Sequence, residues 1–315
     1  MLAAETDFGL EMLRQAPLAH SCVISPISVM MALTMVQMGS KGRTKMQINN
    51  AIAKDISDED IVNHFSRLSA EIGEQSEELY SRIANGLFIS EKYGLKEEYR
   101  KAIEQKLAAA VKAINFNEAD KSAKTINDFV HSNTGGKITD FIRKSSLRDA
   151  TAFIVNAIYF HGAWEHKFPK NKTTKAQFFS AENEAMEIDS MRTKGKRAYA
   201  EDDEIQVLSL EYTDPAYAMN IFLPKKRFGL NELLTKIDGT RIQNLLSRLN
   251  KWFSISIKIP KMKLEPDFNL KEALISMGIT NLFSGNADPT GITEPAQNLM
   301  VPGVSHKAII EVSGC

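Results

Sequence analysis

The residues of this chain that could do chemistry include six histidines, two cysteines and a few stretches rich in glycine or acidic residues. Residues 135–138 (Gly-Gly-Lys-Ile) resemble a phosphate-binding loop. However, Ile138 stands where that loop needs a serine or threonine to hold magnesium, and His131 stands where its first glycine belongs. Residues 303–307 (Gly-Val-Ser-His-Lys) resemble the nucleophile elbow of hydrolases, but a lysine replaces the final glycine. Neither stretch therefore predicts an enzyme.

The sequence offers no pattern that would bind a metal ion tightly. It has no His-Glu-x-x-His motif, and two scattered cysteines, Cys22 and Cys315, make neither a zinc site nor a disulfide framework. The acidic run 201–204 (Glu-Asp-Asp-Glu) could attract a cation, but a solvated loop explains it more simply. We therefore expect no metal and no cofactor, and we expect both cysteines to be free thiols.

His306 is the histidine with the most unusual setting. It shares the apolar face of a predicted strand with Val304 and Ala308, whereas the other histidines fall at polar or boundary positions. A buried imidazole destabilises a fold unless its nitrogens are hydrogen-bonded. Taken alone, His306 is therefore better explained as a satisfied core histidine than as a catalytic base. Because no catalytic constellation accompanies it, the residues predict that the protein is not an enzyme.

The overall composition is that of an ordinary globular protein. The 39 Lys and Arg residues balance 39 Asp and Glu residues, which argues against a dedicated nucleic-acid binder, because such a protein needs a basic excess. The chain reaches Glu5 and Asp7 without the apolar stretch of a secretory leader, and no apolar run approaches the length of a membrane span. We therefore expect a soluble cytoplasmic protein that contacts no membrane.

The elements that must position these residues follow from hydrophobic periodicity. Residues 27–38 are apolar nearly all round, which is typical of a helix buried in a large protein, with Ser25-Pro26 at its start and Gly39 at its end. Ser57 and Asp60 form a capping pattern for a helix whose apolar face runs over 61–72. Other helices are predicted at 8–13, 99–107, 119–134, 230–237, 241–249 and 268–277. Strands are predicted at 83–89, 111–116, 151–160, 207–212, 217–223, 252–264 and 304–312.

The order of these elements predicts the fold class. Helices dominate the first third and strands the later part, without regular strand–helix–strand alternation, which favours an α+β fold. No repeat, low-complexity segment or linker rich in proline and glycine divides the chain. We therefore expect one domain over residues 1–315, which is long enough to bury a substantial core.

Short motifs spread along nearly the whole chain resemble one family, the serpins, which form the serine protease inhibitor superfamily. They include residues 25–29, Ala32-Leu33, Gly39, Gly42, Thr44, Gln47, Asn85, Leu87, Phe88, 126–127, Thr134, 136–138, 155–164, Phe168, Gly278-Ile279, Phe283 and 306–308. In this order and spacing they are most similar to the intracellular, ovalbumin-type members. The resemblance implies helices packed on a large central mixed β-sheet, with smaller sheets that we expect to be incomplete.

The resemblance also implies a mechanism and site residues. A serpin is metastable; a serine or cysteine protease attacks its reactive loop, which then inserts into the large sheet and traps the protease. Four residues, Ser25, Ser28, Asn156 and His306, match the polar cluster called the shutter, where the sheet parts. Two more, Trp164 and Lys261, match the breach, where the loop first enters.

One departure from the family pattern lies after the last predicted strand. The family continues there through an acidic residue and a hinge into the reactive loop, whereas this sequence reads Ser313-Gly314-Cys315. We therefore expect a serpin domain without the hinge, the reactive loop and the last strands, unable to trap a protease itself. The acidic partner of Lys261 would fall near Gly314, so we expect that ion pair to be missing.

Two hypotheses for the function remain open at this stage. The first is a truncated form of a serine-type, or cysteine, endopeptidase inhibitor. The second is a non-inhibitory interaction protein that binds a loop strand or another partner of a second serpin at its incomplete sheet. The expected partners are thus a protease or a peptide strand, and neither nucleic acid, membrane nor heparin. An extracellular location, as for many family members, is the alternative to the cytoplasm.

Overall fold

The computed structural model describes residues 1–17, 21–73, 78–252, 254–265, 268–294, 301–312 and 314 of the 315-residue chain. Cys315, one of the two expected free thiols, and Phe253, within a predicted strand, lie outside the described residues. Cys22 is a free, partly buried thiol, as expected, and burial raises its pKa. Within the described residues, no helix combines the length and the apolar character that crossing a membrane requires.

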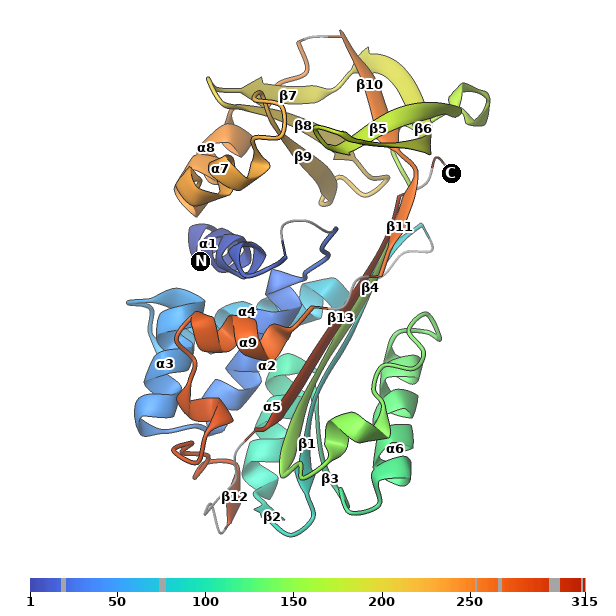
Figure 1. The fold of residues 1–315 in the computed structure, drawn as a ribbon. Coiled ribbons are helices and arrows are strands. Elements are labelled where there is room, and N and C mark those ends of the chain that lie inside the picture. The colour runs from blue at the N-terminus through green and yellow to red at the C-terminus, as the bar shows by residue number, and fades with distance from the viewer. Residues whose placement is uncertain are drawn as a thin grey trace.

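A long mixed sheet of five strands forms the centre of the molecule (Figure 1). In spatial order its strands are β11 (Met262–Leu264), β13 (Gly303–Val312), β4 (Ala152–Gly162), β1 (Leu79–Ser90) and β3 (Ala110–Ile114). Strand β4 runs parallel to β13 and antiparallel to β1, and β1 runs parallel to β3. The predicted strand 151–160, apolar on both faces, is β4 at the middle of this sheet, where helices cover both faces.

Helices cover the two faces of the central sheet unequally. On one face lie α2 (Pro26–Gly39), α5 (Glu97–Leu107), α4 (Asp58–Gly73), α3 (Gly42–Ala53), α1 (Leu2–Arg14) and α9 (Leu270–Ser276). The opposite face packs against α6 (Ala119–Asn133), whose Ile126 and Val130 meet Phe88 and Phe153. A short 3-10 turn, η1 (Lys144–Leu147), packs against α6.

Local sequence explains most of these helices. Eleven of the 14 residues of α2 are buried, and Ser25 caps its start by accepting a hydrogen bond from the backbone N–H of Ser28. Ser57 likewise accepts from the N–H of Asp60, 3.1 Å away, as predicted. Helix α3 was not predicted, because few of its residues are apolar and its burial is limited to positions such as Ile48 and Ile52.

Two further three-stranded sheets lie beyond one end of the central sheet (Figure 1). One has the order β10 (Ser254–Pro260), β6 (Glu184–Lys196) and β5 (Thr174–Ala181), preceded by η2 (Lys170–Lys172). The other has the order β7 (Ala198–Glu201), β8 (Ile205–Glu211) and β9 (Ala218–Pro224), beside α7 (Leu230–Lys236) and α8 (Gly239–Ser247). A small pair, β12 (Thr293–Glu294) with β2 (Gly94–Leu95), and the turn η3 (Asn281–Phe283) complete the described elements.

The α+β architecture is therefore as expected, while strands β5 to β7 were not predicted. Nearly every side chain of the β5–β6 hairpin is exposed as far as Asp189, so no apolar alternation marks it. The predicted strand 252–264 is divided, because Pro260 ends β10 and Lys261 separates it from β11.

Candidate functional site

Three polar residues lie side by side in the middle of the central sheet. Asn156 of β4 is opposite Asn85 of β1 on one side and opposite His306 of β13 on the other. All three side chains are buried, and that of Asn156 is fully inaccessible. A polar row in an apolar sheet is costly unless its members are hydrogen-bonded to one another.

The start of helix α2 completes this row into a closed network. Asn156 Oδ1 accepts a hydrogen bond from Ser28 Oγ, 3.0 Å away, and another from His306 Nδ1. Asn156 Nδ2 donates to Asn85 Oδ1 at 2.6 Å, and Asn85 Nδ2 donates to the Ser28 carbonyl at 3.4 Å. The backbone N–H of Ser25 donates to His306 Nε2 at 3.2 Å. We call these five residues, Ser25, Ser28, Asn85, Asn156 and His306, the polar cluster.

The hydrogen bonds of the polar cluster fix the protonation of His306. Its Nε2 must accept, because the Ser25 N–H can only donate, and its Nδ1 must donate to the amide oxygen of Asn156. The imidazole is therefore neutral, with its proton on Nδ1. Burial lowers the pKa of His306 to about 4, since the cationic form would lose its hydration and would face the Ser25 N–H with a second donor.

The four residues expected at the shutter are thus brought together, and Asn85 joins them. The resemblance placed Asn85 in a strand motif without connecting it to the others. The sequence could not reveal its proximity, because the register between β1 and β4 is a long-range property. Asn85 is the additional member of the site.

Strands β4 and β13 separate beyond the polar cluster. Their pairing runs from Gly303 opposite Phe153 to Ile309 opposite Tyr159. Past that point a cavity of about 210 Å³ lies between the two strand ends. Residues from several elements line it, among them Tyr80, Lys137, Tyr159, Trp164, Tyr212 and Glu311.

Trp164, expected at the breach, lies at this cavity, whereas Lys261 does not line it. The Trp164 ring is buried and stacks on Tyr212, with ring centroids 4.7 Å apart and an interplanar angle of 10°. Lys261 is exposed between β10 and β11, and its backbone N–H donates to the carbonyl of Asp189 at 2.7 Å. No carboxylate of the described residues forms an ion pair with its side chain.

Lys263, two residues further on, lies in β11 at the edge of the central sheet. It is opposite Glu311 in the pairing of β11 with β13, and its Nζ lies 2.8 Å from Glu265. The hydrogen bond to Glu265, with smaller contributions from Glu311 and Tyr159, raises the pKa of Lys263. Sequence reasoning did not single out this residue, because its position opposite Glu311 depends on the register between β11 and β13.

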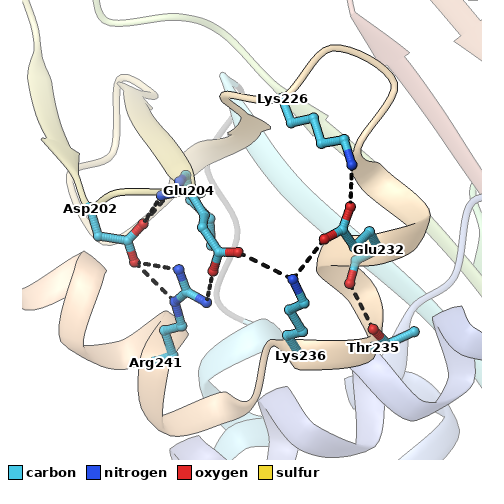
Figure 2. Close-up of polar contacts among 8 residues, drawn as sticks. Asp202, Glu204, Lys226, Glu232, Thr235, Lys236 and Arg241 are labelled. Atoms are coloured by element: carbon cyan, nitrogen blue, oxygen red, sulfur yellow. Dashed lines mark hydrogen bonds and ion pairs between the residues drawn. The ribbon is translucent and has the colours of Figure 1, made fainter.

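The acidic run 201–204 is not a simple solvated loop. Arg241 Nη2 lies 2.8 Å from Asp202, and Arg241 Nη1 lies 2.8 Å from Glu204 (Figure 2). Lys236 contacts both Glu204 and Glu232, so carboxylates and cations alternate across the turn and α7–α8. Within the described part of the chain, no group of three His, Cys, Asp or Glu residues could hold a metal ion.

Comparisons with known proteins establish the family. A sequence profile of the serpins (serine protease inhibitors) matches residues 3–314. The chain is 31% identical over 307 residues to Serine protease inhibitor 42Dd of Drosophila melanogaster, covering 96% of this chain and 81% of that protein. It is 31% identical to Serpin B3 of Homo sapiens over 332 residues, covering 98% and 85%. The leukocyte elastase inhibitor of Sus scrofa matches at 31% over 327 residues, covering 99% and 85%. The chain belongs to the serpin family.

The solved structures agree with this assignment. Uncleaved ovalbumin superimposes with a TM-score of 0.91 at 26% identity, covering all of this chain and 90% of that structure. The predicted fold class is thereby confirmed. The family consists of protease inhibitors rather than enzymes. This agrees with the prediction made from the incomplete catalytic motifs at 135–138 and 303–307.

Proposed function

We propose that the protein is an ovalbumin-type serpin related to inhibitors of serine or cysteine endopeptidases, that residues 1–315 do not trap a protease by themselves, and that strands β4 and β13 are the pair that parts in the family's mechanism. The observation that carries this proposal is the hydrogen bond between Asn156 and His306 across that pair. Hydrogen bonds at a parting line can be exchanged for others, whereas interlocked apolar side chains resist separation. The hydrogen bonds of the polar cluster would then keep β4 and β13 paired in the closed sheet and would break when the strands part.

The cavity past the end of the β4–β13 pairing suggests that the two strands begin to part at this end of the sheet. The strands already diverge there, next to Trp164, so an entering strand would separate the remaining pairs from that end. In this proposal Trp164 lines the opening, and Lys261 or Lys263 provides the positive charge nearby. The inserting strand comes from a reactive loop, which the resemblance places after β13.

Covalent trapping is the experiment that tests inhibition. The chain is incubated with trypsin-, chymotrypsin- and elastase-type serine proteases and with a papain-type cysteine protease, and the products are run on a denaturing gel. Because we expect residues 1–315 to be unable to trap a protease themselves, unmodified protease should be recovered in every lane. A protease-dependent band that resists denaturant would contradict this expectation and would show that these 315 residues suffice for inhibition.

The second candidate function is acceptance of a strand from another chain. It is favoured by β9 and β10, which lie at the outer edges of their sheets in the described residues, and by the cavity between β4 and β13. A synthetic peptide rich in alanine and threonine should raise the melting temperature saturably. The same peptide with alternate prolines should not, because proline cannot donate to a strand ladder.

We infer that residues 1–315 form one domain that acts in the cytoplasm, as in the ovalbumin-type members. The domain assignment is supported by the central sheet, which combines β1 near the start of the chain with β13 near its end, so that no single cut leaves it intact. Limited proteolysis should then yield no stable fragment carrying half of the sheet. Fractionation of the source cells distinguishes the cytoplasm from the extracellular alternative.

A further inference from the structure

The β10–β6–β5 sheet ends in a strand whose outer side is unpaired. Strand β5 pairs with β6 along one side only, and none of its backbone groups hydrogen-bonds to the backbone of another described element. Figure 1 shows the β5–β6 hairpin at the periphery of the molecule, with its turn directed away from the other elements. An uncovered row of N–H and C=O groups can pair with a strand of another chain, so natural proteins usually protect such edges.

The β5 edge lacks most of the usual protection. The strand contains no proline and only one charged side chain, Lys175. Its pairing with β6 becomes irregular only next to Ser180, near the end of the strand. At its centre the strand is apolar, and the rings of Phe178 and Phe179 are 42% and 45% exposed. A regular, exposed and apolar edge of this kind favours association with a further strand.

Both faces of the hairpin present an aromatic ring at this edge. On one face Phe178 lies opposite Met186, which is itself 52% exposed. On the other face the guanidinium of Arg227 lies 4.7 Å from the centroid of the Phe179 ring and holds that ring in place. Two copies of β5 that pair around these residues would bring equivalent rings together on each face, directly opposite or diagonally, and such cross-strand aromatic pairs stabilise a sheet.

The distribution of charge along the hairpin fixes the direction of such a pairing. Residues 166–181 contain four lysines and no acidic residue, whereas residues 182–190 contain four acidic residues and no basic residue. The exposed charges nearest to the start of β5 and to the turn are Lys172, Lys175, Glu182 and Glu184. Two antiparallel copies would place the lysines of each beside the acidic turn of the other, while two parallel copies would oppose like charges.

These charges are mostly free to meet a second copy. Lys175 contacts Asp189 within the hairpin at 3.1 Å, but both side chains remain largely exposed. Lys172, Glu182 and Glu184 form no ion pair with another side chain of the described residues. The edge is therefore self-complementary, with a basic start, an aromatic centre and an acidic end.

We propose that two copies of this chain associate reversibly through their β5 strands, antiparallel about a two-fold axis at Phe178 and Phe179. The two three-stranded sheets then form one six-stranded sheet, and the assembly closes at two chains because each copy has used its β5 edge. The eight residues of β5 make a smaller contact than a standard stable interface, so we expect a dissociation constant on the order of micromolar. This association requires no step of the function proposed above.

Sedimentation of the native chain tests the proposal. Between about 1 and about 100 µM the mass should change reversibly from that of one chain to that of two. Phe178→Lys/Phe179→Lys places like charges at the axis and should raise the dissociation constant at least roughly tenfold. The control Leu2→Lys/Met46→Lys changes two exposed apolar side chains of α1 and α3 and should alter it less than about twofold. Thermal unfolding verifies that each variant is folded.

Two charge variants test the direction of the pairing and do not depend on the aromatic change. Lys172→Glu/Lys175→Glu and Glu182→Lys/Glu184→Lys should each associate more weakly than the native chain, because like charges then meet at both ends. An equimolar mixture of the two variants should associate as the native chain does, since each acidic start then meets a basic turn. No recovery in the mixture would contradict the antiparallel arrangement.

Disulfide formation locates the axis. In the background Cys22→Ser/Cys315→Ser, either Phe178→Cys or Phe179→Cys should cross-link to itself on oxidation. Lys175→Cys should not, because three residues from the axis place its two copies roughly 20 Å apart, beyond the reach of a disulfide. Cross-linking at 175 alone, equal losses in the aromatic variant and its control, or a monomer at every concentration would overturn the proposal. So would species larger than two chains that persist on dilution.

Discussion

His306 donates from Nδ1 to the side-chain oxygen of Asn156 across the β4–β13 pair, while its Nε2 accepts from the backbone of Ser25 at the start of α2. One imidazole therefore joins two neighbouring strands of the central sheet to the buried helix behind them. Both bonds require the neutral ring, so the closure of the sheet is coupled to the protonation state of one residue.

This coupling predicts a stability that falls in acid. In the unfolded chain the imidazole titrates near pH 6.5, whereas in the folded chain the pKa of His306 is about 4. Between these values the unfolded chain binds more protons, so the free energy of unfolding decreases as the pH falls from 7 towards 4. The total from this residue is about 3 kcal/mol.

Urea unfolding at several pH values measures the effect. His306→Gln should flatten the dependence between pH 4 and 7, while His166→Gln, a change at an exposed position, should leave it as in the native chain. An unchanged profile in His306→Gln would show that other groups control the acid response.

Asn156 should be the most sensitive position of the polar cluster. Asn156→Ala removes the acceptor of His306 Nδ1 and Ser28 Oγ and the donor to Asn85. Ser28 Oγ can still donate to the Ser25 carbonyl, but His306 Nδ1 and Asn85 Oδ1 are left unpaired. We expect a loss of about 3 kcal/mol in the free energy of unfolding. Chemical denaturation measures it, with the exposed Asn171→Ala as the control. A loss below about 1 kcal/mol would show that the cluster rearranges without cost.

The two tryptophans form a matched pair for testing the wall of the cavity. Trp164→Ala removes a buried ring stacked on Tyr212 and should destabilise the chain by about 3–5 kcal/mol. Trp252→Ala, at a side chain 79% exposed, should change stability by less than about 0.5 kcal/mol. Iodide should quench Trp252 and spare Trp164. Similar losses in both variants would contradict the described burial.

The sequence predicted those elements whose signal is local. Periodicity and capping located α2 and the apolar β4, because burial on all sides leaves a continuous apolar run. The same local signals did not predict the β5–β6 hairpin, whose side chains are mostly exposed, or α3, which buries few residues. Local patterns cannot mark elements that contribute little to the core.

The candidate site depended on the resemblance rather than on periodicity. Ser28, Asn156 and His306 lie far apart in the chain, and nothing local shows that they meet. Asn85 lies opposite Asn156, and Lys263 lies opposite Glu311, only because of the register of the paired strands. A shift of one residue in that register would separate these pairs, and no local feature of the sequence specifies it.

Arg241 of α8 forms ion pairs with Asp202 and Glu204 of the β7–β8 turn, and we expect these ion pairs to stabilise the fold. Partial burial raises the pKa of Asp202, but hydrogen bonds from the Glu204 and Ile205 backbone and from Arg241 outweigh it, and the pKa is lowered overall. A carboxylate with a lowered pKa stabilises the fold above its ordinary titration range and loses that contribution as the pH falls through the lowered value. Arg241→Ala should therefore cost about 1 kcal/mol at neutral pH, less in high salt and less in strong acid. Denaturation with and without added NaCl measures this, with the exposed Lys121→Ala as the control, and a loss that salt does not reduce would assign Arg241 a packing role instead.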